Sequence, residues 1–255
     1  MYVNLNLKDK KAIITGASRG VGRAIALALA AEGVHVVLGV LEMEMDLANS
    51  VAEEAKNLGV QAWALPLDLG SHDSTLAFMK AAHEALGEMD ILINNAGIFL
   101  QGWCEDVSLS DWQKTLDINI TGAFLTSQYF AKANLDAKKS GRIVNINSQA
   151  AFFGSTSGHV HYAASKAAMT GMTITMAREL SSRDITVNAI ALGIVNTDMI
   201  KANIEKDPHQ YDHRIPRGRF AEPEDIAGIV TFMVSDPASY ITGATIDATG
   251  GMLMR

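Results

Sequence analysis

The sequence has 255 residues, which fits one large domain or two small ones and can bury about 70 to 75% of the surface of the unfolded chain. Hydrophobic residues make up 48% of the chain and charged residues 19%, which argues against a disordered or fibrous protein and favours a large core, an oligomer or both. The formal net charge of -7 argues against nucleic acid as the main partner.

The sequence shows no sign of secretion, of a membrane span or of a metal centre. Cys104 is the only cysteine, so no intrachain disulfide can form and a reduced intracellular thiol is favoured. The amino terminus has no apolar signal-peptide core, and no stretch approaches the roughly 18 apolar residues of a membrane span. Histidines, cysteines and carboxylates show no metal-ligand spacing. We therefore expect a soluble cytoplasmic protein that binds no metal.

Short β-branched apolar runs alternate along the chain with longer segments of helical period, which is typical of βαβ units on a parallel sheet. The pattern predicts strands at Lys11–Thr15, Val34–Val40, Gln61–Pro66, Ile91–Asn94, Arg142–Asn147, Thr186–Ala191 and Thr245–Asp247. It predicts helices at Val21–Ala31, Met45–Leu58, Ser74–Leu86, Leu109–Lys138, Tyr162–Ser182 and Pro223–Ser235. We expect one α/β domain over residues 1–255, a doubly wound seven-stranded parallel sheet with helices on both faces, whose strand carboxyl ends share one ligand-binding edge.

One segment, from Asp198 to Arg219, fits neither period and gathers lysines, histidines and two prolines. An irregular stretch of that length in a compact domain is usually functional or disordered. We interpret residues 198–219 as a mobile flap over the site. An ordinary surface connection is the alternative.

A glycine-rich turn, Thr15-Gly-Ala-Ser-Arg-Gly-Val-Gly22, follows the first predicted strand and opens a helix. Gly16 can take the tight turn, Gly20 lets backbone amides approach a pyrophosphate, and Gly22 lets the helix pack close to the sheet. The spacing differs from the older G-x-G-x-x-G fingerprint, and glycines between a strand and a helix also serve simple close packing. The turn alone therefore indicates a nucleotide site without establishing it.

More motifs follow in register: Asn94-Asn-Ala-Gly97, Asn119, Ser148, Tyr162-Ala-Ala-Ser-Lys166, Pro223-Glu-Asp-Ile226 and Thr242-Gly-Ala-Thr-Ile-Asp247. With the glycine turn, they resemble the short-chain dehydrogenase/reductase family over essentially the whole chain. The resemblance implies a Rossmann-type fold and an NAD(P)-dependent oxidoreductase that interconverts a secondary alcohol and a ketone. We expect cofactor contacts from Gly16, Ser18, Arg19, Gly20, Val21, Gly22, Asp68, Leu69, Asn95, Ala96, Gly97, Tyr162, Lys166, Gly193, Ile194 and Thr197.

Four residues form the candidate catalytic set. Tyr162 and Lys166 lie one helical turn apart on one helix face, so the ammonium can favour the phenolate of a tyrosine whose ordinary pKa is about 10. Ser148, at a strand end, can hold the substrate oxygen. The resemblance assigns these same roles, with Asn119 positioning a water that relays protons to Lys166. Taken singly, each residue also has ordinary uses as a cap, a solvated pair or a buried hydrogen-bonding group.

The sequence departs from the family pattern in two places that border the substrate. Ser148 and Tyr162 are 14 residues apart, about one more than the family pattern has, and Leu192 stands where the family usually has proline. Substrate candidates are Ser148, Gln149, Phe153, His159, Tyr162 and Met199, with Phe99, Trp103, Phe152 and His161 beside them. This mixture fits a small hydroxylated molecule or a 3-oxoacyl group. An acidic carrier protein would need a basic patch at the mouth, for which the candidates are Lys138, Lys139 and Arg183.

The second strand ends Leu38-Gly39-Val40-Leu41-Glu42, and both family determinants of cofactor choice are missing there. The usual acid, which accepts the 2′-hydroxyl of NAD, falls at Val40, and the usual arginine, which binds the 2′-phosphate of NADP, falls at Leu41. Arg19 in the glycine turn favours NADP, while Glu42 can fold back toward NAD. We expect NADP, with NAD as the alternative.

Two other functions compete with catalysis on this fold. A catalytically silent nucleotide-sensing or scaffold protein is one, and the complete set of four catalytic candidates argues against it. Related chemistry, such as dehydration or epimerisation, is the other. The apolar terminal segment Gly250–Arg255 predicts a contact buried between subunits, as in a homotetramer that acts on a small-molecule carbonyl or alcohol.

Overall fold

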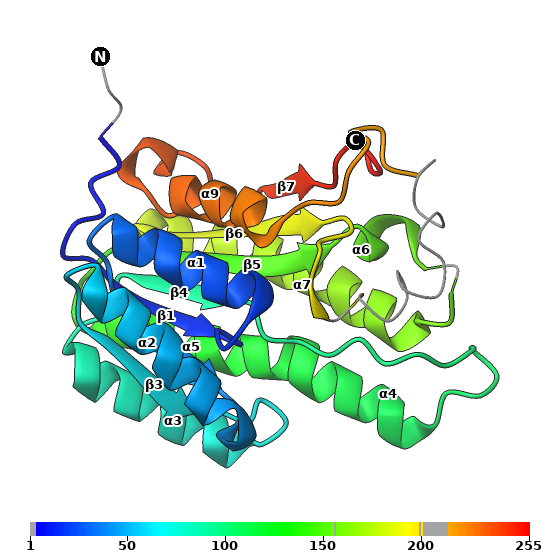
Figure 1. The fold of residues 1–255 in the computed structure, drawn as a ribbon, viewed down its shortest axis with the longest axis horizontal. Coiled ribbons are helices and arrows are strands. Elements are labelled where there is room, and N and C mark those ends of the chain that lie inside the picture. Colours follow the sequence, from blue (N-terminus) through cyan, green and yellow to red (C-terminus); the bar gives the residue numbers. More distant parts are fainter. Residues whose placement is uncertain (1–3, 156, 199, 201–213) are drawn as a thin grey trace.

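Seven short strands, rich in β-branched residues, lie parallel in one sheet (Figure 1). The computed structural model describes residues 4–155, 157–198, 200 and 214–255. The strands are β1 (Lys11–Thr15), β2 (His35–Val40), β3 (Ala62–Pro66), β4 (Ile91–Asn94), β5 (Gly141–Ser148), β6 (Ile185–Leu192) and β7 (Thr245–Ala248). Their order in the sheet is β3-β2-β1-β4-β5-β6-β7. The predicted doubly wound, Rossmann-type sheet is confirmed, with seven of the fourteen strand ends displaced by one residue.

Helices cover both faces of the sheet (Figure 1). One buried cluster packs α1 (Gly20–Ala31), α2 (Met45–Asn57) and α9 (Pro223–Met233) against the strands. The other packs α3 (His72–Leu86), α5 (Gly122–Asp136) and α7 (Val160–Leu180) on the opposite face. None of the helices in the described part of the chain is long and apolar enough to cross a membrane.

The predicted helix Leu109–Lys138 is present but changes to π-helical geometry in its middle and ends two residues early. The structure has α4 (Leu109–Leu116), a π-helical segment (Asp117–Thr121) and then α5, which ends at Asp136. The π-helical segment carries Asn119, whose side chain bonds both backbone groups of Ile98, and such tertiary bonds leave no trace in a periodicity pattern. The short helix α6 (Ala150–Phe153) was not predicted, because four residues are too few to show a period.

The chain order places a crevice at the carboxyl edge of the sheet. β1 lies between β2 and β4, so the connections that leave β1 and β4 run to opposite faces. Ligands of open parallel sheets bind where such connections diverge. Most of the predicted flap, Met199 and residues 201–213, lies outside the described residues.

Candidate active site

A cavity of about 460 Å³ runs along the carboxyl ends of the strands. Residues that follow six strands line it, from the glycine turn after β1 to the segment after β6. All sixteen expected cofactor contacts are in this lining, although they come from segments far apart in the sequence. The sheet therefore collects the predicted nucleotide residues at one place.

The glycine turn is shaped for close backbone approach. Gly16 has a φ of +68°, and its amide donates to Gly39 at the end of β2 at 2.7 Å. A Cβ on Gly22 would lie 2.1 Å from the carbonyl oxygen of Gly16, so no other residue fits there without movement. Asn95 fixes the turn from β4, since its Nδ2 donates to the carbonyl oxygens of Thr15 and Gly16, each at 2.9 Å. The turn leads into the twelve-residue α1, whose free amides favour a phosphate, so these residues fit a dinucleotide.

An acidic residue at the adenosine end of the cavity is Glu44 rather than the expected Glu42. Val40 and Leu41 line the cavity, and Glu42 is exposed in the 3-10 helix that follows. Glu44, at the end of that helix, accepts a hydrogen bond from Ser18 Oγ at 2.8 Å and from Arg19 Nη2 at 2.6 Å. The helical turn, which rotates the chain after β2, points the later glutamate inward. Sequence spacing alone gave no sign of this rotation.

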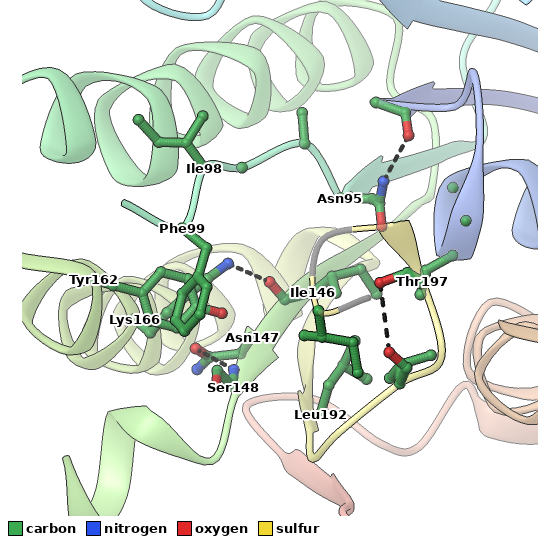
Figure 2. Close-up of a pocket in the computed structure, with 18 of the residues that line it drawn as sticks. Asn95, Ile98, Phe99, Ile146, Asn147, Ser148, Tyr162, Lys166, Leu192 and Thr197 are labelled. Atoms are coloured by element: carbon green, nitrogen blue, oxygen red, sulfur yellow. Dashed lines mark hydrogen bonds between the residues drawn. The ribbon is translucent and has the colours of Figure 1, made fainter. Parts of the chain in front are cut away.

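Ser148, Tyr162 and Lys166 come together in the other half of the cavity, as Figure 2 shows. Ser148 ends β5, and Tyr162 and Lys166 lie in the first two turns of α7. Burial raises the pKa of the Tyr162 phenol, and a hydrogen bond with Ser148 opposes that rise. Burial lowers the pKa of Lys166 to about 8. Lys166 Nζ, which lies 5.7 Å from the Tyr162 ring centre, donates to the carbonyl oxygen of Ile146 at 2.8 Å.

Asn119 lies behind this group and does not line the cavity. Its side chain is fully buried, accepts from the Ile98 amide at 2.8 Å and donates to the Ile98 carbonyl oxygen at 3.0 Å. A Cβ on Gly97 would lie 3.1 Å from Asn119 Oδ1 and 3.9 Å from Lys166 Nζ. Asn119 is thus near Lys166, and its two bonds fix the chain where it leaves β4.

The substrate candidates divide into those in the lining and those behind it. Phe99, Ser148, Gln149, Phe153 and Tyr162 line the cavity. His159 is buried outside the lining, where its ring stacks on Phe99 with 3.8 Å between ring centres, and burial lowers its pKa. His161, Trp103 and Phe152 are also outside the lining, and Met199 lies outside the described residues.

No sequence pattern pointed to the remaining residues that line the cavity. Most are small or apolar residues that carry no chemical signature, and their role follows only from the fold. Those described are Gly39, Glu44, Leu67, Ile98, Ile118, Ile146, Asn147, Ala150, Gly154, Ser155, Ser157 and Val195. Asp198, Ile200 and Arg214 also line the cavity, and they belong to the segment 198–219 that was predicted to lie over the site.

The proposed basic patch for a carrier protein is wrong in its placement. Lys138 and Lys139 precede β5, and Arg183 precedes β6, so all three lie at the amino ends of strands. The cavity is at the carboxyl ends, on the opposite edge of the sheet. Lys139 is also paired with Glu88.

Comparisons with known proteins agree with this geometry. A family model described as Enoyl-(Acyl carrier protein) reductase matches residues 16–253. A 3-oxoacyl-(acyl-carrier-protein) reductase of Synechocystis sp. is 41% identical over 97% of this chain and 98% of its own.

Solved structures are similar as well. A short-chain type dehydrogenase/reductase from Mycobacterium marinum has a TM-score of 0.93 and 31% identity, and the alignment covers 99% of this chain and 98% of that one. A short chain dehydrogenase from Burkholderia cenocepacia in complex with NADP has a TM-score of 0.88 and 35% identity, covering 96% of this chain and 98% of that one. With its glycine turn and its Ser148, Tyr162 and Lys166 in one cavity, this chain belongs to the short-chain dehydrogenase/reductase family and is an NAD(P)-dependent oxidoreductase.

Proposed function

We propose that this enzyme interconverts a ketone and a secondary alcohol, with Tyr162 as general acid and base. The observation that carries the proposal is the placement of Ser148, Tyr162 and Lys166 in one cavity with the nucleotide residues. The bound nicotinamide supplies or accepts the hydride. In the reducing direction, Ser148 and Tyr162 form hydrogen bonds with the carbonyl oxygen. As the π electrons of the carbonyl move onto this oxygen, the Tyr162 hydroxyl gives it a proton.

Lys166 stabilises the deprotonated form of Tyr162 that this step leaves. The ammonium lowers the free energy of the phenolate that remains after proton transfer, and burial of both groups strengthens the effect. A proton then returns to Tyr162 from solvent by way of Lys166, and Asn119, which bonds both backbone groups of Ile98, fixes the chain beside this route. In the oxidising direction the same groups act in reverse.

NADP is the cofactor that the adenosine end favours. Arg19 is the cation of the glycine turn and lines the cavity, where a 2′-phosphate can pair with it. The NADP complex of the Burkholderia cenocepacia relative supports this choice. NAD remains the alternative, because Glu44 lies beside Arg19.

The substrate we propose is a small hydroxylated ketone or alcohol, or a 3-oxoacyl group. Phe99, Phe153 and Leu192 supply apolar walls, and Ser155 and Ser157 add hydroxyls. The name of the Synechocystis relative favours the 3-oxoacyl group. The cavity lies on the carboxyl edge, so a carrier protein would dock on a surface other than Lys138, Lys139 and Arg183.

We also propose that the enzyme works as a homotetramer in the cytoplasm. Large apolar side chains are exposed on several helices, among them Phe124, Ile174 and Phe232, which fits burial between subunits. The exposed thiol of Cys104 fits a reducing compartment. Within the terminal segment, Met252 and Leu253 are partly buried, and Arg255 pairs with Asp247 of its own chain at 2.7 Å.

The test of the proposed chemistry is the Tyr162→Phe variant. NADPH and NADH are titrated by nicotinamide fluorescence, and a panel of ketones, sugars and 3-oxoacyl thioesters is then added to wild type. We expect Tyr162→Phe, which keeps the ring and loses only the hydroxyl, to lose at least about 100-fold in kcat, a larger loss than any change in its Kd for the cofactor. Equal turnover by the two proteins would rule out Tyr162 as the proton donor.

A further inference from the structure

The strand that carries Ser148 extends beyond its neighbour on one side. β4 ends at Asn94, which pairs with Asn145 of β5. β5 continues for three more residues to Ser148, and these residues pair only with β6. The candidate catalytic serine is therefore on a free strand edge.

Beyond the end of β4, some backbone groups of β5 still point toward the side where β4 would lie if it were longer. The amide of Arg142 donates to Asp90 on the β4 side, whereas the amide of Gln149 donates to Leu192 on the β6 side. Successive residues of a strand direct their amides to opposite sides. The carbonyl of Ile146 and the amide of Ser148 thus face the β4 side beyond the end of β4. Buried backbone groups need partners, so side chains must supply them.

Two side chains take the place of the missing strand, as Figure 2 shows. Lys166 Nζ donates to the carbonyl oxygen of Ile146 at 2.8 Å, and the amide of Ser148 donates to Asn147 Oδ1 at 2.9 Å. Asn147 is only 2% exposed, and its Nδ2 donates to Thr170 Oγ1 on α7 at 2.9 Å. Thr170 lies one helical turn after Lys166.

We propose that Asn147 is a positioning residue that sets the separation between Ser148 and the Tyr162 and Lys166 pair. Its amide joins the strand edge that carries Ser148 to the helix that carries the other two residues. This inference rests on the proposed function, because it assumes that Ser148 and Tyr162 share the substrate oxygen. The side chain of Asn147 bonds the amide of Ser148 and the hydroxyl of Thr170, so it acts through Ser148.

Asn145 offers a matched control on the same strand and the same helix. It is fully buried, and its Nδ2 donates to Thr173 Oγ1 of α7 at 2.9 Å, the same type of bond at the same distance. Its other side-chain bond is with Asn94 of β4, not with Ser148. A general loss of contact between β5 and α7 would affect both asparagines. A positioning role would affect only Asn147.

The experiment measures single-turnover rates with enzyme in excess over NADPH, so that slow variants still give a rate. We expect Asn147→Ala to lower the rate about 10- to 100-fold while the Kd for NADPH stays within about twofold, since small misplacements of reacting groups have effects of this size. Thr170→Val leaves the Ser148 bond in place and should lower the rate about three- to tenfold. Asn145→Ala and Thr173→Val should lose stability and keep rates within about threefold of wild type. If Asn147→Ala and Asn145→Ala lowered the single-turnover rate by the same factor, Asn147 would have only a structural role. The same would follow from an equal loss of rate in Thr170→Val and Thr173→Val.

A double-mutant cycle with Ser148→Ala decides whether Asn147 acts through Ser148. Without the Ser148 hydroxyl there is nothing for Asn147 to position, so Asn147→Ala should slow Ser148→Ala by less than about threefold. Asn145→Ala should have the same small effect in both backgrounds. Full additivity of Asn147→Ala with Ser148→Ala would overturn the proposal. If Ser148→Ala and Tyr162→Phe both turned over like wild type, the proposed function itself would fail, and that result is distinct from a failure confined to Asn147.

Discussion

The nucleotide half and the substrate half of the cavity are built in different ways. The nucleotide half comes from strand ends and the glycine turn, where neighbouring backbone segments are in direct contact and Gly22 has no room for a Cβ. The substrate half adds to the end of β5 and the start of α7 two segments, residues 98–102 and 157–159, which hold each other through the amide of Gly102 and the carbonyl oxygen of Gly158 at 2.8 Å. The first half is fixed by the sheet. The second depends on loop contacts and can vary without changing the fold.

The largest effect should come from filling the closest contact of the nucleotide half. Gly22→Ala would place a Cβ 2.1 Å from the Gly16 carbonyl oxygen and 2.6 Å from Asn95 Nδ2, so the turn must move. We expect the Kd for NADPH to rise at least about 100-fold, because the phosphate-binding amides leave their positions. Fluorescence titration of the nicotinamide measures this Kd.

Gly228→Ala is the matched control for that substitution. Gly228 also lies within a helix, α9, but a Cβ there would meet no atom within 4 Å. Alanine should therefore stabilise the helix by up to about 1 kcal/mol and leave the Kd unchanged. Normal NADPH binding by Gly22→Ala would show that close packing does not shape the nucleotide half.

The sequence predicted the nucleotide half much better than the substrate half. Gly16, Gly20 and Gly22 lie in one short local pattern whose meaning does not depend on distant residues, and all three line the cavity. Glu44 was missed because a helical turn after β2 decides which glutamate points inward. Local sequence predicts local geometry, and this choice is not local.

The substrate half shows the same limit. His159 was a reasonable candidate, but its ring stacks behind Phe99 because the loop that contains it pairs with Gly102. In this paired loop, Gly158 has a φ of +77°. Nothing near His159 in the sequence indicates Gly102 as its partner. Contacts between two loops that are distant in the sequence therefore could not be predicted from sequence patterns.

Lys166 joins the two halves, and its buried charge has a measurable consequence. Its pKa of about 8 is below the value of 10.5 expected for an exposed lysine, so between these pH values the unfolded chain binds more protons than the folded chain. Wild-type stability should therefore rise with pH across this window. Lys166→Met removes the buried charge and also the donor to the Ile146 carbonyl oxygen, so the pH dependence is the informative quantity: its free energy of unfolding relative to wild type should fall by about 1 to 3 kcal/mol as the pH rises from 7 to above 10.5.

Urea unfolding at several pH values measures this difference. The difference should stop changing above about pH 11, where the wild-type lysine is largely neutral in both states. Lys80→Met, at an exposed position on α3, should show no such pH dependence. A wild-type stability that stayed flat across the window would contradict a lowered pKa for Lys166. Carbonyl reduction should also slow above about pH 8, as Lys166 loses its proton.

A smaller effect is expected at the adenosine end, from Glu44→Gln. The Glu44 carboxylate holds Arg19 and would repel a 2′-phosphate, so the amide should lower the Kd for NADPH about three- to tenfold. NADH has no 2′-phosphate, so its Kd should change less than about twofold. Glu42→Gln, two residues earlier in the same exposed turn, is the control and should alter neither value. A gain that survives in 1 M salt would not be electrostatic.

The smallest effect should separate two adjacent phenylalanines of α6. Phe153 lines the substrate half, whereas Phe152 lies outside the lining and stacks with Arg255, whose guanidinium carbon is 3.6 Å from the ring centre. Because Phe153 is still 48% exposed, Phe153→Ala should raise the substrate KM only about two- to fivefold, with no change in the Kd for NADPH. Phe152→Ala should leave the KM unchanged and lower the thermal midpoint slightly. Steady-state kinetics at saturating NADPH compare the two variants. If Phe152→Ala raised the KM as much as Phe153→Ala, the wall would depend on the whole of α6 rather than on the one ring that faces the cavity.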